Sequence, residues 1–314
     1  MCSDYLNASS SDRGAVLTQL AQEYRQPELV SPLGAPGVDY ECVEYPNETL
    51  GQIAQSFGRT NPTAGASSSP SAPSEPNQSG IAGILDAVTN PSPSVVSAVG
   101  TGGQPGELTR LPGNSVLRAS NGEPLVVWVA AEYCPFCAAE RWVMVMWLSR
   151  FGTFTNLSEI QSSSTDIYPD TDGFTFYKSS YSSQYVAFSP NEIEDRNKQP
   201  LMSMSSQVSN IFATWDQPPY TIQSGQFPFL DIGGTFTLST TSYTPNDLAG
   251  LSWSQIADDL SAPTSTVARD IIGNANILTA ATCIVTRNQP SSVCASPTIQ
   301  AIEPALEQLA PPSS

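Results

Sequence analysis

The chain contains no histidine and few charged residues. Its 314 residues include 12 Lys or Arg and 29 Asp or Glu, so the formal net charge is −17. Charged residues make up 13% of the chain, about half of the usual share. An acidic chain of this kind is not expected to bind nucleic acid or anionic lipid. Sparse charge with abundant Ser, Thr and Pro is typical of a secreted or surface protein. It would also suit an acidic medium, because few side chains of the protein would be protonated there.

Long hydrophobic runs are also absent. The longest apolar stretches, Leu125 to Ala131 and Val143 to Leu148, are far shorter than the roughly 20 residues of a transmembrane helix. Residues 1–15 lack the basic start and the apolar centre of a signal peptide. We therefore expect an extracytoplasmic protein, secreted or at the cell surface, that is anchored by a segment outside this chain. Glycosylation is permitted at four Asn-x-Ser/Thr sequons, Asn7, Asn47, Asn77 and Asn156.

The most informative motif is the Cys-Pro-Phe-Cys sequence from Cys134 to Cys137. It lies between an apolar strand pattern, 125–131, and a helical pattern, 138–151. A Cys-x-x-Cys pair at a strand-to-helix junction is typical of a redox dithiol. The unpaired N–H groups and partial positive charge of a helix N-terminus stabilise a thiolate. Cys134 is therefore the candidate nucleophile, and Cys137 is the candidate resolving thiol.

Two other roles are open to a Cys-x-x-Cys pair. A zinc site needs four ligands, but the chain has no histidine and the nearest other cysteines, Cys42 and Cys283, are far away in sequence. We therefore expect no metal. The pair could instead form an inert structural disulfide, since oxidising compartments are rich in them. The alternative function is therefore that of a non-catalytic subunit, at the cell surface or in a membrane complex.

The four remaining cysteines suit structural disulfides, because an even number of cysteines is typical of an oxidising compartment. Cys283 and Cys294 flank a turn-rich connection, and a bridge across such a loop would contribute roughly 3 kcal/mol. By elimination, Cys2 pairs with Cys42. A lipid on Cys2 is the alternative, but it would leave Cys42 as an odd thiol, so we favour the disulfide.

Three charged residues lie near the dithiol in sequence. Glu132 would oppose a thiolate by its like charge, yet it could carry a proton for Cys137. Arg141 follows Cys134 by two helical turns and could favour a thiolate on that side of the helix. We nevertheless favour an ordinary surface ion pair between Arg141 and Glu140 or another carboxylate.

The segment Ala131 to Trp142, AEYCPFCAAERW, resembles the signature of an uncharacterised prokaryotic family. Members are thioredoxin-like, usually membrane-anchored and extracytoplasmic, and are known only as a domain of unknown function. The likeness extends from about Pro91 to about Ser296, and the active-site motif is also similar to the C-P-x-C sites of glutaredoxin type in the thioredoxin superfamily. Neither resemblance identifies a substrate, because one fold hosts many functions. Further marks of the family are Ser149 to Gly152, Ser163 to Ser189 with FTFY at 174–177, Phe227 to Gly234 and Leu278 to Cys283.

The resemblance implies an α/β, thioredoxin-like fold in which a cis-proline beside the dithiol precedes the third strand. Phe227 and Pro228 match this position, and the backbone before the proline would bind a partner chain as an added strand. An ordinary loop proline is the alternative, because only about 5–6% of X-Pro bonds are cis. Thioredoxins carry a buried aspartate six residues before the first cysteine. Here that residue is Trp128, which argues against efficient reductase chemistry.

Composition and periodicity divide the chain into three parts. Residues 1–60 form a helical N-terminal extension, in which Asp12 can cap an amphipathic helix. Residues 61–80 form a Ser/Pro/Gly linker. Residues 81–314 form the thioredoxin-like domain, with a long insertion around 152–172 and a C-terminal helical, disulfide-closed segment. Within this domain we expect strands at 124–131, 174–177 and 185–188, a hairpin of 229–232 and 235–238, and helices at 137–151, after the Ser252–Gln255 capping box, and at 264–281.

These patterns together predict an extracytoplasmic thiol-disulfide oxidoreductase. Cys134 attacks a substrate disulfide or donates its own, and Cys137 resolves the mixed disulfide. The reaction needs no bound cofactor, because electrons pass to or from the thiols and disulfides of a protein partner. A membrane redox protein fits that role, and a nucleic acid partner is not expected.

Overall fold

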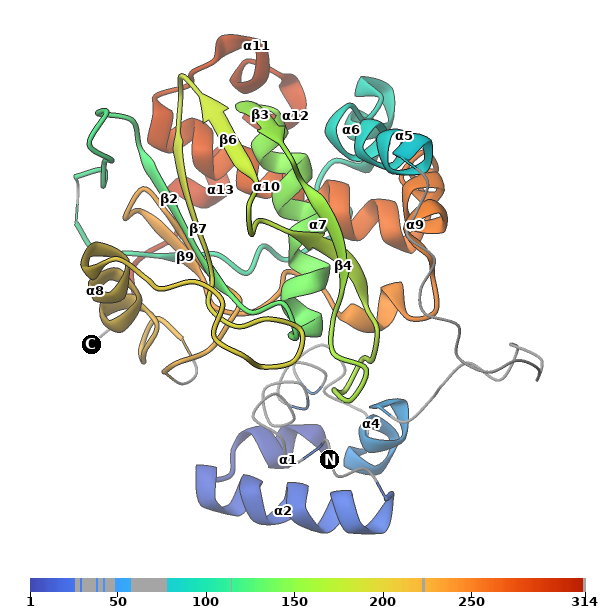
Figure 1. Ribbon diagram of the computed structural model, residues 1–314. Coiled ribbons are helices and arrows are strands. Elements are labelled where there is room, and N and C mark those ends of the chain that lie inside the picture. The colour runs from blue at the N-terminus through green and yellow to red at the C-terminus, as the bar shows by residue number, and fades with distance from the viewer. Residues whose placement is uncertain are drawn as a thin grey trace.

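The computed structural model describes residues 1–25, 29, 38, 42, 49–57, 78–113, 115–221 and 224–312. Its centre is a five-stranded mixed sheet with helices on both faces (Figure 1). Strand β2 (Leu125–Ala130) is central, and it pairs with β7 (Ala187–Glu192) in parallel and with β8 (Phe229–Ile232) in antiparallel orientation. The strand order is β1 (Thr109–Arg110), β9 (Phe236–Leu238), β8 (Phe229–Ile232), β2 (Leu125–Ala130) and β7 (Ala187–Glu192).

Every residue of β2 is buried, because helices cover both faces of the sheet. The side chains of Val126 and Trp128 lie in the main core with the helices α7 (Pro135–Ser149) and α10 (Thr266–Thr286). Those of Leu125 and Val127 lie in a second core with the helix α8 (Ser206–Trp215). The expected continuous apolar strand is confirmed, and α8 is a helix that the sequence analysis did not predict.

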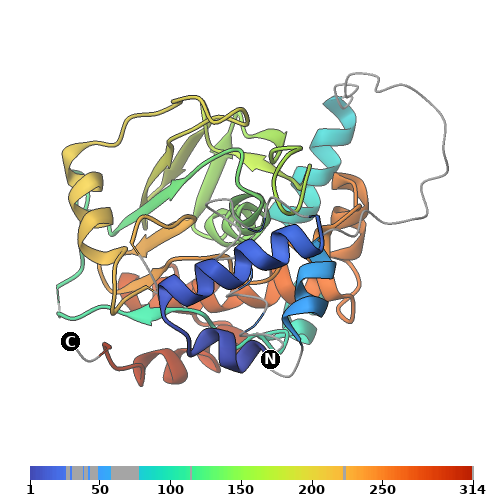
Figure 2. The same ribbon diagram turned by 90° about the horizontal axis from the view of Figure 1, so that it is seen from below.

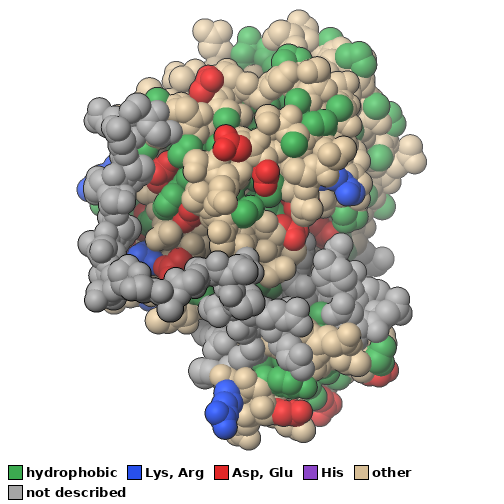
Figure 3. Space-filling model, turned by 90° about the vertical axis from the view of Figure 1, so that its right-hand side faces the viewer, with side chains coloured by type: hydrophobic (Ala, Val, Ile, Leu, Met, Phe, Trp, Pro, Cys, Tyr) green, Lys and Arg blue, Asp and Glu red, His purple; other side chains and the backbone are tan. Residues whose placement is uncertain are grey.

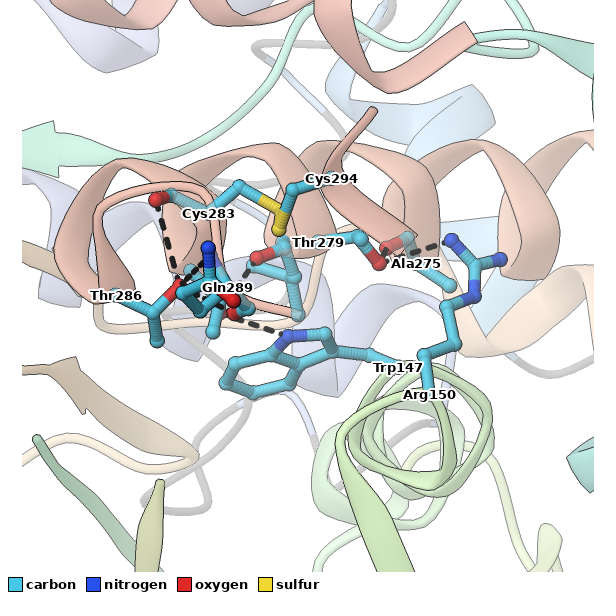
Figure 4. Close-up of a disulfide and its surroundings, with 10 residues drawn as sticks. Trp147, Arg150, Ala275, Thr279, Cys283, Thr286, Gln289 and Cys294 are labelled. Carbon is cyan, nitrogen blue, oxygen red and sulfur yellow. Dashed lines mark hydrogen bonds between the residues drawn. A yellow bond between two sulfur atoms is a disulfide. The ribbon is translucent and has the colours of Figure 1, made fainter. Parts of the chain in front are cut away.

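Helices α7 (Pro135–Ser149) and α10 (Thr266–Thr286) pack together on one face of the sheet. Trp147 of α7 donates from Nε1 to Thr282 Oγ1 of α10 at 2.9 Å, and Arg150 donates to Thr279 Oγ1 at 2.8 Å (Figure 4). Both helices were predicted. The structure starts α7 two residues earlier and extends α10 to Thr286.

The structure contains the two disulfides that were paired from the sequence. Cys2, at the start of α1 (Cys2–Leu6), is joined to Cys42. Cys283, near the end of α10, is joined to Cys294 (Figure 4). The C-terminal segment is therefore helical and closed by a disulfide, and its helices are α11 (Ser291–Cys294), α12 (Pro297–Gln300) and α13 (Glu303–Glu307).

The insertion after α7 forms two antiparallel pairs of strands. An aromatic cluster supports them: the Phe154 ring stacks on Phe176 at 5.5 Å, and Phe176 contacts Phe188 edge-on at 5.0 Å. The strand predicted at 174–177 ends at Thr175, and the one predicted at 185–188 begins at Ala187 and continues to residue 192. The pairs are β3 (Gly152–Thr155) with β6 (Ser180–Ser183), and β4 (Ser158–Gln161) with β5 (Asp172–Thr175).

The N-terminal helices α1, α2 (Ser10–Glu23) and α4 (Leu50–Phe57) lie across the end of the molecule at which α7 begins (Figures 1 and 2). Their buried apolar side chains belong to the same core as those of α7. Asp12 is not the N-cap of α2. Ser9 has that role, because its side chain accepts from the Asp12 N–H.

Helices α5 (Gln78–Thr89) and α6 (Pro93–Val99) begin the part of the chain that follows residues 61–77. Most of the predicted linker, 61–77, lies outside the described residues, and its last three residues already belong to α5. The predicted hairpin of β8 and β9 is confirmed. The capping box at Ser252 is also present and opens α9 (Trp253–Asp259), which follows the short 3-10 helix η2 (Pro245–Leu248).

The described surface carries little exposed apolar area. Met1 and Leu309 are the large hydrophobic residues exposed within the described part of the chain. Apolar side chains are scattered among polar ones on the face shown in Figure 3. None of the described helices is long and apolar enough to cross a membrane.

Candidate active site

Cys134 is the N-cap residue of α7, and Cys137 lies in the first turn of that helix. The Cys137 N–H donates to Cys134 Sγ at 3.2 Å. A first-turn N–H group, which has no partner within the helix backbone, therefore points at the sulfur of the first cysteine. Both cysteines are free thiols, and both have no exposed surface. The dithiol thus stands at the predicted junction between β2 and a helix.

Phe227 and Pro228 lie beside this dithiol. Their peptide bond is cis, and Cys134 Sγ is 3.8 Å from the carbonyl oxygen of Phe227. Strand β8 begins at the next residue, Phe229. The structure therefore brings the predicted proline, the start of a strand and the first cysteine together.

The aromatic residues next to the two cysteines in sequence contact other rings edge-on. Tyr133 contacts Phe227 edge-on, with ring centroids 6.0 Å apart, and Phe136 contacts Tyr168 in the same way at 5.7 Å. The ammonium group of Lys198 lies 4.7 Å from the centroid of the Tyr133 ring. Burial raises the pKa of Tyr133, and the nearby Cys134 adds to this effect. The dithiol is therefore buried next to aromatic side chains.

This environment acts strongly on Cys137. Burial raises the pKa of its thiol well above the usual value, and the adjacent Cys134 raises it further. The positive charge of Arg141 and a hydrogen bond with the backbone of Ala131 act in the opposite direction. Burial and the neighbouring sulfur thus disfavour the thiolate form of Cys137, whereas Arg141 favours it.

Arg141 is not on the surface, and it does not pair with Glu140. Its side chain is completely buried, and its ion-pair partner is Glu192, at the end of β7. Arg141 Nε donates to Glu192 Oε1 at 3.0 Å, and Nη2 donates to Glu192 Oε2. The preferred interpretation of Arg141 as part of a surface ion pair is therefore wrong, because neighbouring elements cover the whole length of α7 up to Leu148.

Glu192 is the residue of this site that the sequence analysis missed. Besides Arg141, its carboxylate accepts a hydrogen bond from Trp128 Nε1 at 3.3 Å. Trp128 lies on β2, and the carboxylate reaches its indole group from the neighbouring strand β7. Glu192 pairs with Ala130 in the parallel register of β2 and β7, and no signal in the local sequence marks that contact.

Glu132 is buried two residues before Cys134. Its Oε1 accepts a hydrogen bond from Thr175 Oγ1 at 2.6 Å. Burial raises the pKa of Glu132, although the bond from Thr175 opposes this effect. The Arg141–Glu192 pair acts on the same carboxyl group, so Glu132 belongs to one electrostatic cluster with them.

Glu140 lies on α7 but serves a different contact. Its carboxylate accepts hydrogen bonds from Ser242 N at 2.7 Å, from Ser242 Oγ at 2.9 Å and from Thr241 Oγ1 at 3.2 Å. Burial raises the pKa of Glu140 to about 7. These contacts attach α7 to the segment before η2. Glu140 therefore has a structural role and does not act on the dithiol.

Metal ligands are not gathered around the cysteines. In the described ranges, no group of three or more His, Cys, Asp or Glu side chains is arranged to hold a metal ion. The chemistry that this arrangement can perform is that of two adjacent thiols beside a buried cation and two carboxyl groups.

The chain matches the model of a protein family. Residues 114–284, more than half of the chain, match the model of a domain of unknown function (DUF929). This range contains the dithiol, the cis-proline, Arg141 and Glu192. No curated protein and no solved structure matches the chain. The chain therefore belongs to the DUF929 family of uncharacterised proteins.

Proposed function

We propose that this protein is an extracytoplasmic thiol-disulfide oxidoreductase. The observation that carries the proposal is the pair of free thiols at the start of α7, with the Phe227 carbonyl and the cis-proline beside Cys134. A dithiol at a helix N-terminus is the arrangement in which a thiolate is best stabilised. The two disulfides elsewhere in the chain are compatible with an oxidising compartment.

The topology supports a thioredoxin-like interpretation of the domain. The strands β9, β8, β2 and β7 are neighbours in that order, and α7 lies between β2 and β7 in sequence. This gives a β-α-β unit with a parallel pair, followed by an antiparallel hairpin, with α10 packed against α7 on one face. In such a domain the dithiol and the proline loop meet at one edge, as Cys134 and Phe227 do here.

The reaction follows from the roles of the two cysteines. The Cys134 thiolate attacks a partner disulfide, a Cys134–partner disulfide forms, and one partner sulfur leaves as a thiolate that takes up a proton. Cys137 then loses its proton and attacks Cys134. The Cys134–Cys137 bond forms, the second partner sulfur leaves, and the partner is reduced as the enzyme is oxidised. The reverse sequence oxidises a partner dithiol.

The reduction potential of the Cys134–Cys137 couple tests this function. Protein equilibrated with a glutathione redox series, alkylated and weighed by mass spectrometry should give a value between roughly −270 and −120 mV, the range of thioredoxin-like catalysts. The Cys283–Cys294 disulfide in the same samples serves as an internal control and should stay oxidised. A value for the dithiol below about −300 mV would mark an inert bridge and contradict the proposal.

A non-catalytic subunit is the second candidate, and the complete burial of both sulfurs favours it. In this case the cysteines would be part of the core, and the fold would serve as a scaffold in a complex. The two candidates differ in whether a protein disulfide can reach Cys134. In Cys137→Ala, which lacks the resolving thiol, a stable mixed disulfide between Cys134 and a partner supports catalysis, whereas its absence supports the scaffold.

A further inference from the structure

Arg141 is held rigidly, one helical turn after Cys137. Its Nε and Nη2 donate to Glu192, and Nη2 also donates to the Ala131 carbonyl oxygen at 3.0 Å. The guanidinium carbon lies 5.9 Å from the centroid of the Trp128 ring. The side chain has no exposed surface, so it cannot turn away into solvent. The positive charge is therefore fixed at the dithiol end of α7.

One nitrogen of this guanidinium group has no partner. Within the part of the chain that the structure describes, Arg141 Nη1 is buried and makes no hydrogen bond. A buried polar group without a partner is costly, and a guanidinium N–H is a strong donor to anions. Glu192 balances the charge of Arg141 but leaves Nη1 free. Nη1 can therefore donate a hydrogen bond to an anion that forms close to it.

The anion that forms there during the proposed reaction is the Cys137 thiolate. Cys137 and Arg141 are four residues apart on α7, a spacing that places two side chains on the same helix face. Both side chains also meet Ala131, which accepts from Arg141 and whose backbone makes a hydrogen bond with Cys137. Burial disfavours this thiolate, and the charge of Arg141 favours it.

We propose, building on the function proposed above, that Arg141 is a positioning residue for the resolving step, in which it stabilises the Cys137 thiolate. Cys137 gives up its proton and attacks the sulfur of Cys134 in the mixed disulfide. The Cys134–Cys137 bond forms, the bond from Cys134 to the partner breaks, and the departing partner thiolate is protonated. Glu192 holds the guanidinium in place and reduces its net charge.

Ellman's reagent separates this step from the first one. Reduced protein releases one equivalent of thionitrobenzoate when Cys134 attacks the reagent, and a second when Cys137 displaces thionitrobenzoate from Cys134. The second release needs no reagent to enter the site, so its rate reports the intramolecular step. Its pH dependence reports the formation of the Cys137 thiolate.

The variant R141M/E192Q removes both charges of the buried pair, so neither charge is left alone in the core. We expect its second release to be at least about tenfold slower at pH 7, with the midpoint of the pH profile moved upward. R150M is the matched control, because Arg150 follows the same helix and its Nη1 bonds to Asn276 and Thr279. It should keep the wild-type rate and midpoint.

E192Q provides a second test that removes a single charge and keeps the cation. Because Glu192 no longer offsets Arg141, the second release should be faster and its midpoint lower than in the wild type. An unchanged midpoint in R141M/E192Q, or a slower second release in E192Q, would overturn the role of Arg141. A wild-type protein that gives no second equivalent would instead overturn the oxidoreductase proposal, so the two failures are distinguishable.

Discussion

Trp128 and Glu192 are joined by a hydrogen bond between neighbouring parallel strands, from the indole Nε1 to the carboxylate Oε1 at 3.3 Å. Both side chains have no exposed surface. The bond links the central strand β2 to the carboxylate that holds Arg141, and so it connects the core of the sheet with the dithiol. A buried charge is tolerated only when such donors surround it.

Replacing Trp128 by Phe should therefore destabilise the protein, because Glu192 loses a donor in a buried site. We expect the free energy of unfolding in denaturant to fall by about 1–3 kcal/mol more than in Trp147→Phe. Trp147 is the matched control, since it is equally buried but donates to the neutral Thr282 hydroxyl. Equal losses in the two variants would show that the bond to Glu192 adds no stability.

The two cysteines should behave differently when mutated. Cys137→Ala should accumulate mixed disulfides between Cys134 and partner proteins, because the resolving thiol is missing. Cys134→Ala should accumulate none, because the nucleophile itself is missing. Non-reducing gels followed by mass spectrometry measure the adducts. Similar trapping by both variants would show that the nucleophile is misassigned.

The three possible disulfides should differ in their resistance to reduction. In oxidised protein, brief exposure to a low thiol concentration should open the Cys134–Cys137 bond first. The Cys2–Cys42 and Cys283–Cys294 bonds should remain, because structural disulfides have lower reduction potentials than redox-active dithiols. Non-reducing peptide mapping gives the order. A peptide that links Cys283 to Cys134 or Cys137 would indicate an internal electron relay. It would contradict a purely structural role for the other two disulfides.

Asp231 should make the protein less stable as the pH rises. It is fully buried on β8, its Oδ1 accepts from Gly234 N at 2.7 Å, and Oδ2 has no partner among the described residues. Burial raises its pKa to about 7 from a usual value of 3.8. A raised carboxyl pKa stabilises the folded state below the usual pKa, and this contribution is lost as the pH rises toward 7.

The variant Asp231→Asn mimics the protonated carboxyl group at every pH. At pH 8 its free energy of unfolding should exceed that of the wild type by about 2–4 kcal/mol, and at pH 4 the two should be nearly equal. Asp258→Asn, at an exposed position of α9, is the control and should change little at either pH. If Asp231→Asn were less stable than the wild type at pH 8, the carboxylate would be the preferred form.

The sequence allowed the parts of the fold with local signals to be predicted. The dithiol at a strand-to-helix junction, the hairpin around Gly233 and Gly234, and the capping box at Ser252 all depend on residues within a few positions of one another. Helix α8 also has such a signal, which was overlooked. Ser205 caps it, and its buried residues Val208 and Ile211 are three positions apart.

The environment of Arg141 could not be predicted in the same way. Glu192 is 51 positions away from Arg141 and approaches it only because β7 pairs with β2 in one particular register. Charged residues on a helix normally indicate an exposed face, whereas α7 is buried on every side up to Leu148. A contact that depends on the whole tertiary structure leaves no trace in the residues around either partner.

The absence of exposed surface at Cys134 has a kinetic consequence. A bulky disulfide can reach this sulfur only while the molecule is transiently open, so the measured reactivity is the product of an opening equilibrium and the intrinsic rate of the thiolate. A slow reaction with large reagents would then show that the site opens rarely, and not that the thiol is inert. Burial would protect the dithiol from non-specific oxidation, so that it reacts mainly with partners that bind tightly enough to keep the site open.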